Sequence, residues 1–420
     1  MNSTAFKNAD ILIPNKNVNM EKWAVIACDQ YTSEPEYWNK VYENVADSPS
    51  SLSLILPEIY LENDDISNRI ENIHKSMDKY ISDGIFTEYK NSMIYVERIQ
   101  SNGILRKGII GAIDLEEYDF SKGSTSQVRA TEATVIERIP PRIKVRQGAP
   151  LELPHIMILI DDENDTVFSS IDKNNLEKLY DTDLMMNGGS ICGYLVDENT
   201  QELIDKALLA LSDPDAFSEK YGLKDTPVLL YAMGDGNHSL ATAKEFYEQL
   251  KKSNPDRDFS NHPARYALAE IVNLHSDALK FEAIHRIVTD VNVTELLTDL
   301  SEKLALSSES GLQKITVVEN GVHRDTYINK PLSNLAVGSL QSALDEILPD
   351  IGGKVDYIHG TDVIDELSKK NNSVGFILPD MDKSELFPTV IKDGALPRKT
   401  FSMGHAEDKR FYIEARKITE

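Results

Sequence analysis

The chain is 420 residues long and 41% hydrophobic, which is enough to bury a substantial core and to form more than one compact unit. It carries 69 acidic and 44 basic residues, a formal net charge of -25. This balance excludes broad electrostatic attraction to nucleic acid or to an anionic membrane, so any anion must be bound locally.

The cysteines and the hydropathy pattern predict a cytoplasmic protein. Cys28 and Cys192 have no C-x-x-C spacing and cannot build a disulfide framework, which suits a reducing compartment. The N-terminal stretch 1–17 lacks a basic segment followed by an apolar one, and no apolar run approaches the roughly 20 residues of a membrane helix. We expect neither a nucleic-acid partner nor a membrane partner.

Short β-branched runs alternate with longer amphipathic runs, and there are no internal repeats. This rhythm predicts an α/β or α+β fold with mixed sheets. Two amphipathic runs come first, followed by two strand-like runs joined at the turn Asn102-Gly103. The predicted elements are helices at 34–46 and 64–85 and strands at 93–99 and 105–113.

Residues 129–147, RATEATVIERIPPRIKVRQ, place charged side chains around Pro140 and Pro141. We expect an ordered loop here rather than a core element. The alternation then resumes. The next predicted elements are strands at 155–160, 191–196, 228–233, 266–274 and 281–288, and helices at 200–211 and 240–250.

A second alternation begins after about residue 290 and predicts a second domain. Its elements are helices at 294–304, 340–348 and 363–370 and strands at 355–359 and 374–378. We therefore predict a core over 1–290 and a smaller α/β unit over 291–420. The polar, glycine-punctuated stretch 393–409 has the character of a site loop, and we expect its PRKTFSMG segment to return to the site of the core.

The stretch GDGNHS, residues 234–239, lies between an apolar run that ends at Met233 and a predicted helix. Such a turn leaves free N–H groups and a positive dipole end, which suit phosphate or another anion. Glycine lets the backbone approach a ligand, Ser239 or Asn237 can cap the helix, and His238 can donate to an oxygen. The alternative is that the glycines only permit a tight turn and His238 is a satisfied surface residue.

Three more specific nucleotide- or phosphate-binding motifs are excluded by the sequence. No Walker loop exists, because Gly352-Gly353-Lys354 is followed by Val355. A dinucleotide fingerprint needs a third glycine where Ser239 stands. Two-metal phosphoesterases use G-D and G-N-H on separate strands with a D-x-H motif, whereas here both fragments are fused in one turn and D-x-H is absent.

The turn DGNHS, with Ala241 and Ala243 behind it, resembles the D-G-H-H-R-x-x-A box of the ParB-like and free serine kinase superfamily. Over nearly its full length the chain resembles the bacterial "domain of unknown function ten-fifteen" family. The matching stretches are WAVIACDQYTSEPEYW, RATEATVIERIPPRIKV, GDGNHS, Ala283-Ile284-His285-Arg286 and PRKTFSMGHAEDKRFY. The resemblance implies a nucleotide-handling fold in which the N-terminus of the box's helix holds phosphates.

The resemblance also implies catalytic roles. Asp235 and His238 match the box, and Asp235 is expected to assist a metal ion such as Mg²⁺ or the acceptor hydroxyl. Glu34, on a polar turn after an apolar run, is the candidate base toward that hydroxyl. Alternatively, Glu34 only complements the dipole of the helix that follows it, which a neighbouring hydroxyl residue caps.

Phosphate or nucleotide binding is expected at the turn. The residues expected to provide it are Gly234, Gly236, Asn237 and Ser239. Two of these depart from the box, because Asn237 replaces its first histidine and Ser239 its arginine, so the cationic contact must come from elsewhere. The cations in matching stretches are Arg286, Arg398 and Lys399.

Glu132 and Thr134 form either a polar clamp around a small substrate or part of a surface salt-bridge cluster with the arginines nearby. Three further histidines lack metal-ligand spacing and are expected to be structural: His155, His262 and His275.

Three functions remain open. The first is a phosphotransferase that moves phosphate between ATP or ADP and the hydroxyl of free serine or a similar small molecule. The second is a nucleotide-binding sensor of the ParB-like type without phosphotransfer. The third is a metal-independent scaffold or binding protein.

Overall fold

The computed structural model describes residues 4–61, 63–132 and 136–420. The chain divides into two compact units. The first consists of Met1–Ala130, Thr134–Leu279 and His405–Glu420, and the second of Thr131–Ala133 and Lys280–Gly404. The second unit therefore begins at Lys280 and not after residue 290 as predicted. Residues His405–Glu420 belong to the first unit.

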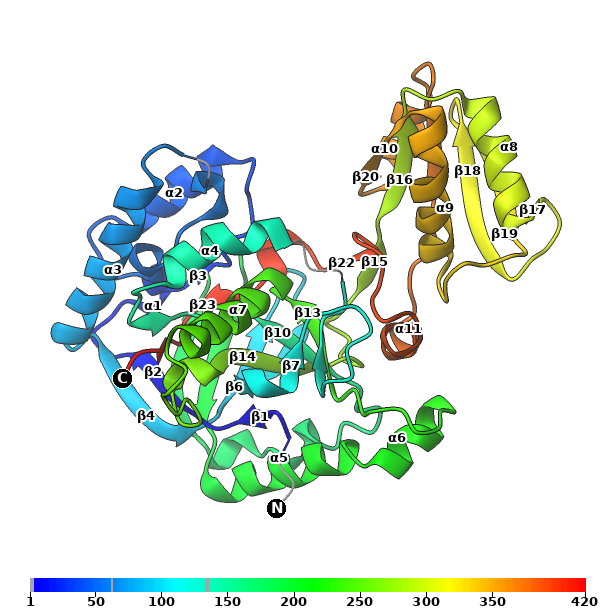
Figure 1. Ribbon diagram of the computed structural model, residues 1–420. Coiled ribbons are helices and arrows are strands. Elements are labelled where there is room, and N and C mark those ends of the chain that lie inside the picture. Colours follow the sequence, from blue (N-terminus) through cyan, green and yellow to red (C-terminus); the bar gives the residue numbers. More distant parts are fainter. Residues whose placement is uncertain (1–3, 62, 133–135) are drawn as a thin grey trace. The chain divides into compact units, whose positions relative to one another are not determined.

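A large mixed sheet forms the centre of the first unit (Figure 1). Its strands, in spatial order, are β11 (Glu177–Asp183), β12 (Ser190–Leu195), β5 (Ile94–Ile99), β6 (Leu105–Asp114), β14 (Tyr266–Asn273), β10 (Met157–Ile160), β13 (Tyr231–Asp235), β8 (Val128–Arg129) and β7 (Tyr118–Asp119), with β1 (Phe6–Lys7) on β6. The pairs β10–β14, β13–β8 and β7–β8 are parallel and the others antiparallel. The predicted mixed α/β architecture is confirmed.

Three two-stranded sheets and a set of helices complete the first unit. The strand pairs are β2 (Ala9–Pro14) with β4 (Phe86–Ser92), β3 (Val25–Ile26) with β23 (Phe411–Tyr412), and β9 (Leu151–Glu152) with β24 (Arg416–Lys417). The helices are α1 (Met20–Trp23), α2 (Pro35–Val45), α3 (Ile66–Ser82), α4 (Ile139–Arg146), α5 (Glu198–Leu211), α6 (Pro214–Tyr221) and α7 (Asn237–Ser253). Two of the small sheets thus join the last residues to early segments.

Helix α4 corrects the prediction of a loop over 129–147. Pro140 and Pro141 lie at its first positions, where a missing N–H costs nothing because those groups have no intrahelical partner. The same prolines would break a helix interior. Helix α4 packs beside α7 (Figure 1), and this contact gives its otherwise charged sequence a buried side.

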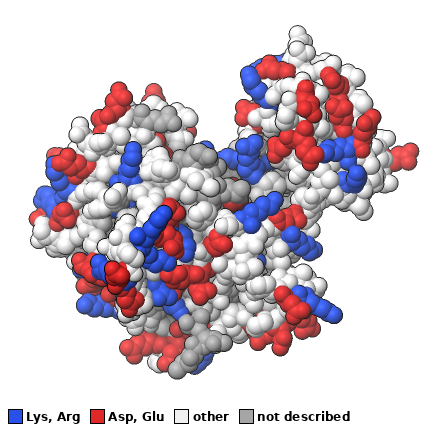
Figure 2. All heavy atoms as spheres, in the orientation of Figure 1, with Lys and Arg blue, Asp and Glu red and all other residues white. Residues whose placement is uncertain are grey.

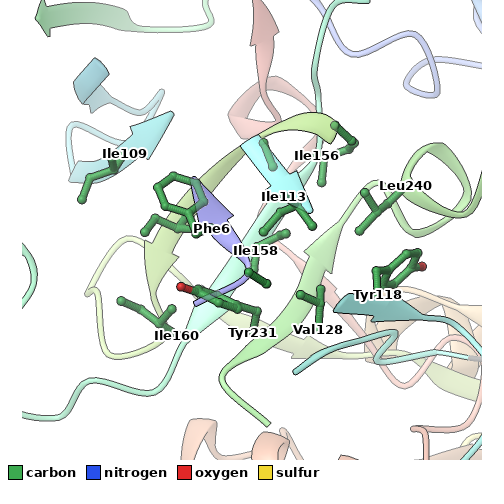
Figure 3. Close-up of a cluster of buried hydrophobic side chains, with 14 of the residues drawn as sticks. Phe6, Ile109, Ile113, Tyr118, Val128, Ile156, Ile158, Ile160, Tyr231 and Leu240 are labelled. Carbon is green, nitrogen blue, oxygen red and sulfur yellow. The ribbon is translucent and has the colours of Figure 1, made fainter. Parts of the chain in front are cut away.

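Apolar side chains of the large sheet and of helix α7 form the core of the first unit. Strand β10 is buried along its whole length, and α7 buries Leu240, Ala243 and Tyr247 against the same cluster. Figure 3 shows Leu240 directed toward the cluster that contains Tyr118 and Val128. The start of α7 is therefore held rigidly at the end of β13.

The second unit contains an antiparallel sheet and a separate strand pair. The sheet order is β17 (Leu306–Ser307), β19 (Val322–Ile328), β18 (Gln313–Glu319), β21 (Val374–Ile377), β16 (His285–Thr289) and β20 (Lys354–Ile358), and β15 (Phe281–Ala283) pairs with β22 (Phe401–Met403). Its helices are α8 (Val293–Leu304), α9 (Ala336–Ile351), α10 (Thr361–Ser368) and α11 (Leu386–Asp393). The single strand predicted over 281–288 is two strands, β15 and β16.

Acidic side chains are spread over the face shown in Figure 2, with lysines and arginines between them. None of the helices in the described ranges combines the length and apolar character needed to span a bilayer.

Candidate functional site

The β13–α7 turn contains two glycines, and each is required there for a different structural reason. Gly236 precedes the helix with φ 77°, a left-handed conformation that costs other residues about 1–2 kcal/mol. A Cβ on Gly236 would also lie 3.1 Å from Cα of Ile156. Gly234 has an ordinary φ, but a Cβ there would lie 3.0 Å from Cγ of Leu159 on the neighbouring strand. Both glycines therefore bring the turn close to β10.

The first turn of α7 differs from the prediction that Ser239 or Asn237 caps it. Gly236 occupies the N-cap position and, having no side chain, makes no side-chain cap hydrogen bond. The side-chain Oδ1 of Asn237 is buried and has no hydrogen-bond partner among these residues. An unsatisfied buried acceptor indicates that a hydrogen-bond donor or a cation belongs here.

Asp235 is neutralised by a lysine from the C-terminal segment. Its Oδ1 accepts the N–H of Gly236 at 2.9 Å, and its Oδ2 lies 3.2 Å from Nζ of Lys409. Both side chains are largely buried, so this ion pair is stronger than an exposed one. The buried Arg98 fixes the segment by donating to the carbonyls of Lys409 at 2.5 Å and Glu407 at 2.7 Å. Lys409 thus supplies a cation beside the turn.

His155, predicted to be structural, contacts the turn directly. Its Nε2 lies 2.9 Å from Oγ of Ser239 and its Nδ1 lies 2.8 Å from the hydroxyl of Tyr412. Asp29 Oδ2 is 3.9 Å from the same Nε2. The buried imidazole therefore links three segments of the first unit.

The groups around His155 have fixed protonation states. Burial by itself raises the pKa of the Asp29 carboxyl. The charges of His155 and Lys409, with a hydrogen bond from Gln30, outweigh burial, so the pKa lies below its usual value and the carboxylate is ionised at neutral pH. Burial raises the pKa of Tyr412 well above that of free tyrosine, so its hydroxyl keeps its proton. An ionised acid thus faces the imidazole.

A cavity of about 160 Å³ opens beside the turn. His155, Ser239 and Thr242 contribute to its wall, and the remaining lining is mainly aliphatic. Thr242 donates from its hydroxyl to the carbonyl of His238 at 2.6 Å, which fixes the first turn of α7 on this side.

Glu34 and His238, predicted to be catalytic, lie in different settings. Glu34 is exposed and immediately precedes α2, where it makes no side-chain cap hydrogen bond in the described structure. Burial raises the pKa of Tyr31 and Tyr37, and the charges of Glu407 and Glu34 raise it further, so both carboxylates lie near this tyrosine pair. His238 is half-buried in the first turn of α7. His238 therefore belongs to the turn itself, whereas Glu34 belongs to a tyrosine-rich surface beside residue 407.

Four further predicted site residues belong to the second unit: Glu132, Arg286, Arg398 and Lys399. Arg286 is completely buried, and its guanidinium donates to Gln341 Oε1 and to the carbonyls of Ile284, Lys399 and Arg398. Binding phosphate there would require giving up these partners. Burial lowers the pKa of Arg286 to about 10.

The loop that Arg286 holds carries the exposed Arg398 and Lys399. Lys399 adopts φ 56°, and the Arg398 guanidinium stacks over the ring of Tyr357. Glu132 forms an isolated bridge with Leu396. Thr134 lies outside the described residues. Arg286 therefore organises the loop, and phosphate binding by Arg398 and Lys399 stays a prediction.

One cluster of side chains has the spacing of a metal site within the described part of the chain, and it does not include Asp235. It consists of Asp161, Glu163 and His275. Lys220 lies 3.0 Å from Asp161 and 3.3 Å from Glu163, so the acids of this cluster are already neutralised. We assign it no function.

Comparison with solved structures returns distant matches. A free serine kinase in complex with ADP is 12% identical with a TM-score of 0.38, covering 73% of this chain and 91% of that one. A conserved hypothetical protein from Pyrococcus furiosus is 11% identical with a TM-score of 0.35, covering 73% and 94%. C-terminally truncated SbnI from Staphylococcus aureus is 9% identical with a TM-score of 0.35, covering 72% and 82%.

Comparison with the curated proteins finds no match. A family model described as "Protein of unknown function (DUF1015)" matches residues 12–391. This range includes the β13–α7 turn, His155 and Arg286. The chain therefore belongs to the DUF1015 family.

Proposed function

We propose that the protein is a nucleotide-dependent phosphotransferase that moves a phosphoryl group between ATP or ADP and the hydroxyl of a small molecule such as free serine. The observation that carries the proposal is the β13–α7 turn. It combines a glycine-opened helix N-terminus with the Asp235–Lys409 pair and the buried, unsatisfied Oδ1 of Asn237. Helix N-termini and lysines are both established means of holding phosphate.

Each part of the turn has a role in this proposal. The dipole and N–H groups at the start of α7 would hold phosphate oxygens, and Lys409 would neutralise their charge. If Lys409 exchanged Asp235 for the phosphates, the oxygens of Asp235 and Asn237 would be available to a Mg²⁺ ion, which prefers oxygen ligands and commonly takes one or two protein groups together with phosphates. Bound there, Mg²⁺ would offset the charge that develops on the transferred group.

The acceptor hydroxyl needs a base, and His155 is placed better for this than Glu34. In the proposed step the acceptor oxygen bonds to the terminal phosphorus of the nucleotide, the bond to the leaving phosphate breaks, and the hydroxyl proton passes through Ser239 Oγ to His155 Nε2. The ionised Asp29 would stabilise the imidazolium. Glu34 as the base stays the prediction derived from resemblance alone.

The test is incubation of the full chain with Mg²⁺, ATP or ADP labelled in the terminal phosphate, and a mixture of free amino acids, with detection of phosphoserine. We expect transfer by the parent and its loss in Asp235→Asn and His238→Ala, with thermal stability preserved. Asp215→Asn, an exposed acid in the first turn of α6, is the matched control. Unchanged binding and turnover in both turn variants would mean that the turn is only architecture.

The second candidate is a nucleotide sensor that binds without transfer. The exposure of Glu34 favours it, because a base at that surface is poorly protected from water. Saturable nucleotide binding that depends on Asp235, with no labelled product from any acceptor, would establish the sensor instead of the phosphotransferase.

A further inference from the structure

The cavity beside the β13–α7 turn is lined largely by apolar side chains, which a polar acceptor such as serine does not require. It lies wholly within the first unit. Its aliphatic lining includes Leu54, Leu56, Met77, Val145, Leu151 and Leu153, which come from the segments around α3, α4 and β9. His155 and Ser239 form part of the same wall. An apolar surface thus adjoins the groups that we propose to handle the acceptor's proton.

The size of the cavity limits its occupant. At about 160 Å³ it is smaller than the roughly 300–1,000 Å³ of pockets that bind drug-sized ligands, so it does not hold a nucleotide. A molecule of a few carbon atoms is the appropriate size. An occupant beside Ser239 would therefore be the partner of the nucleotide rather than the nucleotide itself.

The charges around the cavity favour a carboxylate on this molecule. Arg142 pairs with Glu58, and Arg146 pairs with Glu152 at 2.6 Å. Glu152 also accepts a hydrogen bond from Nε of Arg416 at 2.9 Å. In this arginine cluster three guanidinium groups therefore share two carboxylates, while the ionised Asp29 lies at the His155 side of the cavity.

One donor in this cluster lacks an acceptor. Nε of Arg146 is buried and makes no hydrogen bond within the described part of the chain. Glu152 cannot readily serve it, because that carboxylate already accepts from both arginines and from the N–H of Leu268 at 2.9 Å. A buried cationic donor without an acceptor is costly, and a ligand carboxylate would satisfy it with a charge-assisted bond.

We propose that the cavity binds the acceptor of the phosphotransfer, and that this acceptor is a small monocarboxylic acid with an aliphatic body and a hydroxyl group. The inference rests on the proposed function. The carboxylate contacts Arg146, the carbon chain occupies the space between the leucines, and the hydroxyl faces Ser239 and His155. Each methylene group buried against such walls strengthens binding by about fourfold.

The experiment is calorimetric titration of the full chain, without nucleotide, with 2-hydroxy acids from glycolate to 2-hydroxyhexanoate, with L-serine and with the carboxamide of each acid. We expect affinity to rise about fourfold per methylene until the cavity is filled. We expect 2-hydroxybutanoate to bind more tightly than serine, and each acid at least tenfold more tightly than its amide. Equal binding of acid and amide, no dependence on chain length, or no binding of any acid would overturn the proposal.

Two variants test the same contacts. Arg146→Met approximately keeps the length of the side chain. It should weaken the binding of the acids at least tenfold without weakening the binding of the amides. Ala149→Phe, which fills the lined space, should abolish the dependence on chain length. The matched control is Arg324→Met, an exposed arginine of the second unit. The comparison of acid with amide on the parent chain does not depend on whether the variants fold.

The result separates this inference from the proposed function. Acid binding with the expected preferences but no transfer from ATP or ADP would sustain the cavity assignment and remove the phosphotransferase. Transfer to serine whose KM is unchanged by both Arg146→Met and Ala149→Phe would sustain the phosphotransferase and overturn the cavity assignment.

Discussion

Ser239 Oγ and His155 Nε2 lie 2.9 Å apart, although 84 positions separate the two residues in the chain. The contact joins the first turn of α7 to the residue two positions before β10. The hydroxyl of Tyr412 lies 2.8 Å from the other ring nitrogen, Nδ1, and Asp29 Oδ2 lies 3.9 Å from Nε2. A hydroxyl, an imidazole and an ionised acid therefore meet at the helix end where we propose that phosphate binds.

Replacement of His155 by glutamine should lower the rate of transfer far more than nucleotide affinity. General base catalysis by a positioned histidine contributes about 10²–10⁴-fold, and kcat should fall by that amount while the KM for nucleotide stays within about threefold. Tyr412→Phe, which removes only the partner of Nδ1, should have a smaller effect. Steady-state kinetics of both variants measure this, and an unchanged kcat in His155→Gln would exclude the histidine as the base.

Replacement of Gly236 by alanine should impair both stability and nucleotide binding. The left-handed conformation costs alanine about 1–2 kcal/mol, and the added Cβ would also crowd Ile156. Gly84 is the matched control, because it has a similar φ of 67° but open space around its Cβ. Urea unfolding should show a larger loss for Gly236→Ala than for Gly84→Ala, and only Gly236→Ala should weaken nucleotide binding. Equal effects on both properties would contradict the role assigned to the turn.

Replacement of Arg286 by methionine should destabilise the second unit by about 3 kcal/mol. The change leaves the buried carbonyl of Ile284 and the partly buried carbonyls of Arg398 and Lys399 without their donor, and hydrogen bonds from charged groups contribute about 1.5–3 kcal/mol each. Arg398→Met, at an exposed position of the same loop, should change stability by no more than about 0.5 kcal/mol. Chemical unfolding curves of the two variants test the difference, and similar losses would argue against the organising role of Arg286.

The second unit should lose stability as the pH falls from 7 toward 5. Burial lowers the pKa of His285, and its Nδ1 accepts the N–H of Leu378, so the folded state keeps the ring neutral. Below about pH 6.5 the unfolded chain takes up a proton that the folded chain does not, and stability therefore falls as the pH decreases toward the folded pKa. His285→Asn, whose side-chain oxygen can replace Nδ1 as acceptor, should flatten this part of the profile. Unfolding at pH 5, 6 and 7 compares the parent with the variant, and an unaltered slope would assign the effect to other groups.

The local parts of the site could be predicted from sequence, because they depend on neighbouring residues. The apolar run, the two glycines and the amphipathic segment behind them predict a strand, a turn and a helix, and β13 and α7 confirm them. The contacts of His155 could not be predicted in this way. They depend on β10 pairing with β13 and on a C-terminal segment that brings Tyr412, and no spacing in the sequence encodes either.

Tertiary position decides two features that residue type alone does not. The sequence predicts that Arg286 binds phosphate; in β16 its guanidinium is buried among backbone carbonyls, and phosphate binding by it stays a prediction. The prolines at positions 140 and 141 predict a loop, whereas at the first positions of helix α4 they are well tolerated. In both cases the tertiary position of the residue, and not its type, determines its structural role.

The return of His405–Glu420 to the first unit has a consequence for biosynthesis. Strands β3 and β9 find their partners, β23 and β24, only in this final segment. During translation the second unit can therefore complete its sheet while the earlier part still lacks Lys409 and Tyr412. A ribosome-bound nascent chain stalled before residue 405 should accordingly carry an inactive, protease-sensitive first unit, and emergence of residues 405–420 from the exit tunnel should complete it.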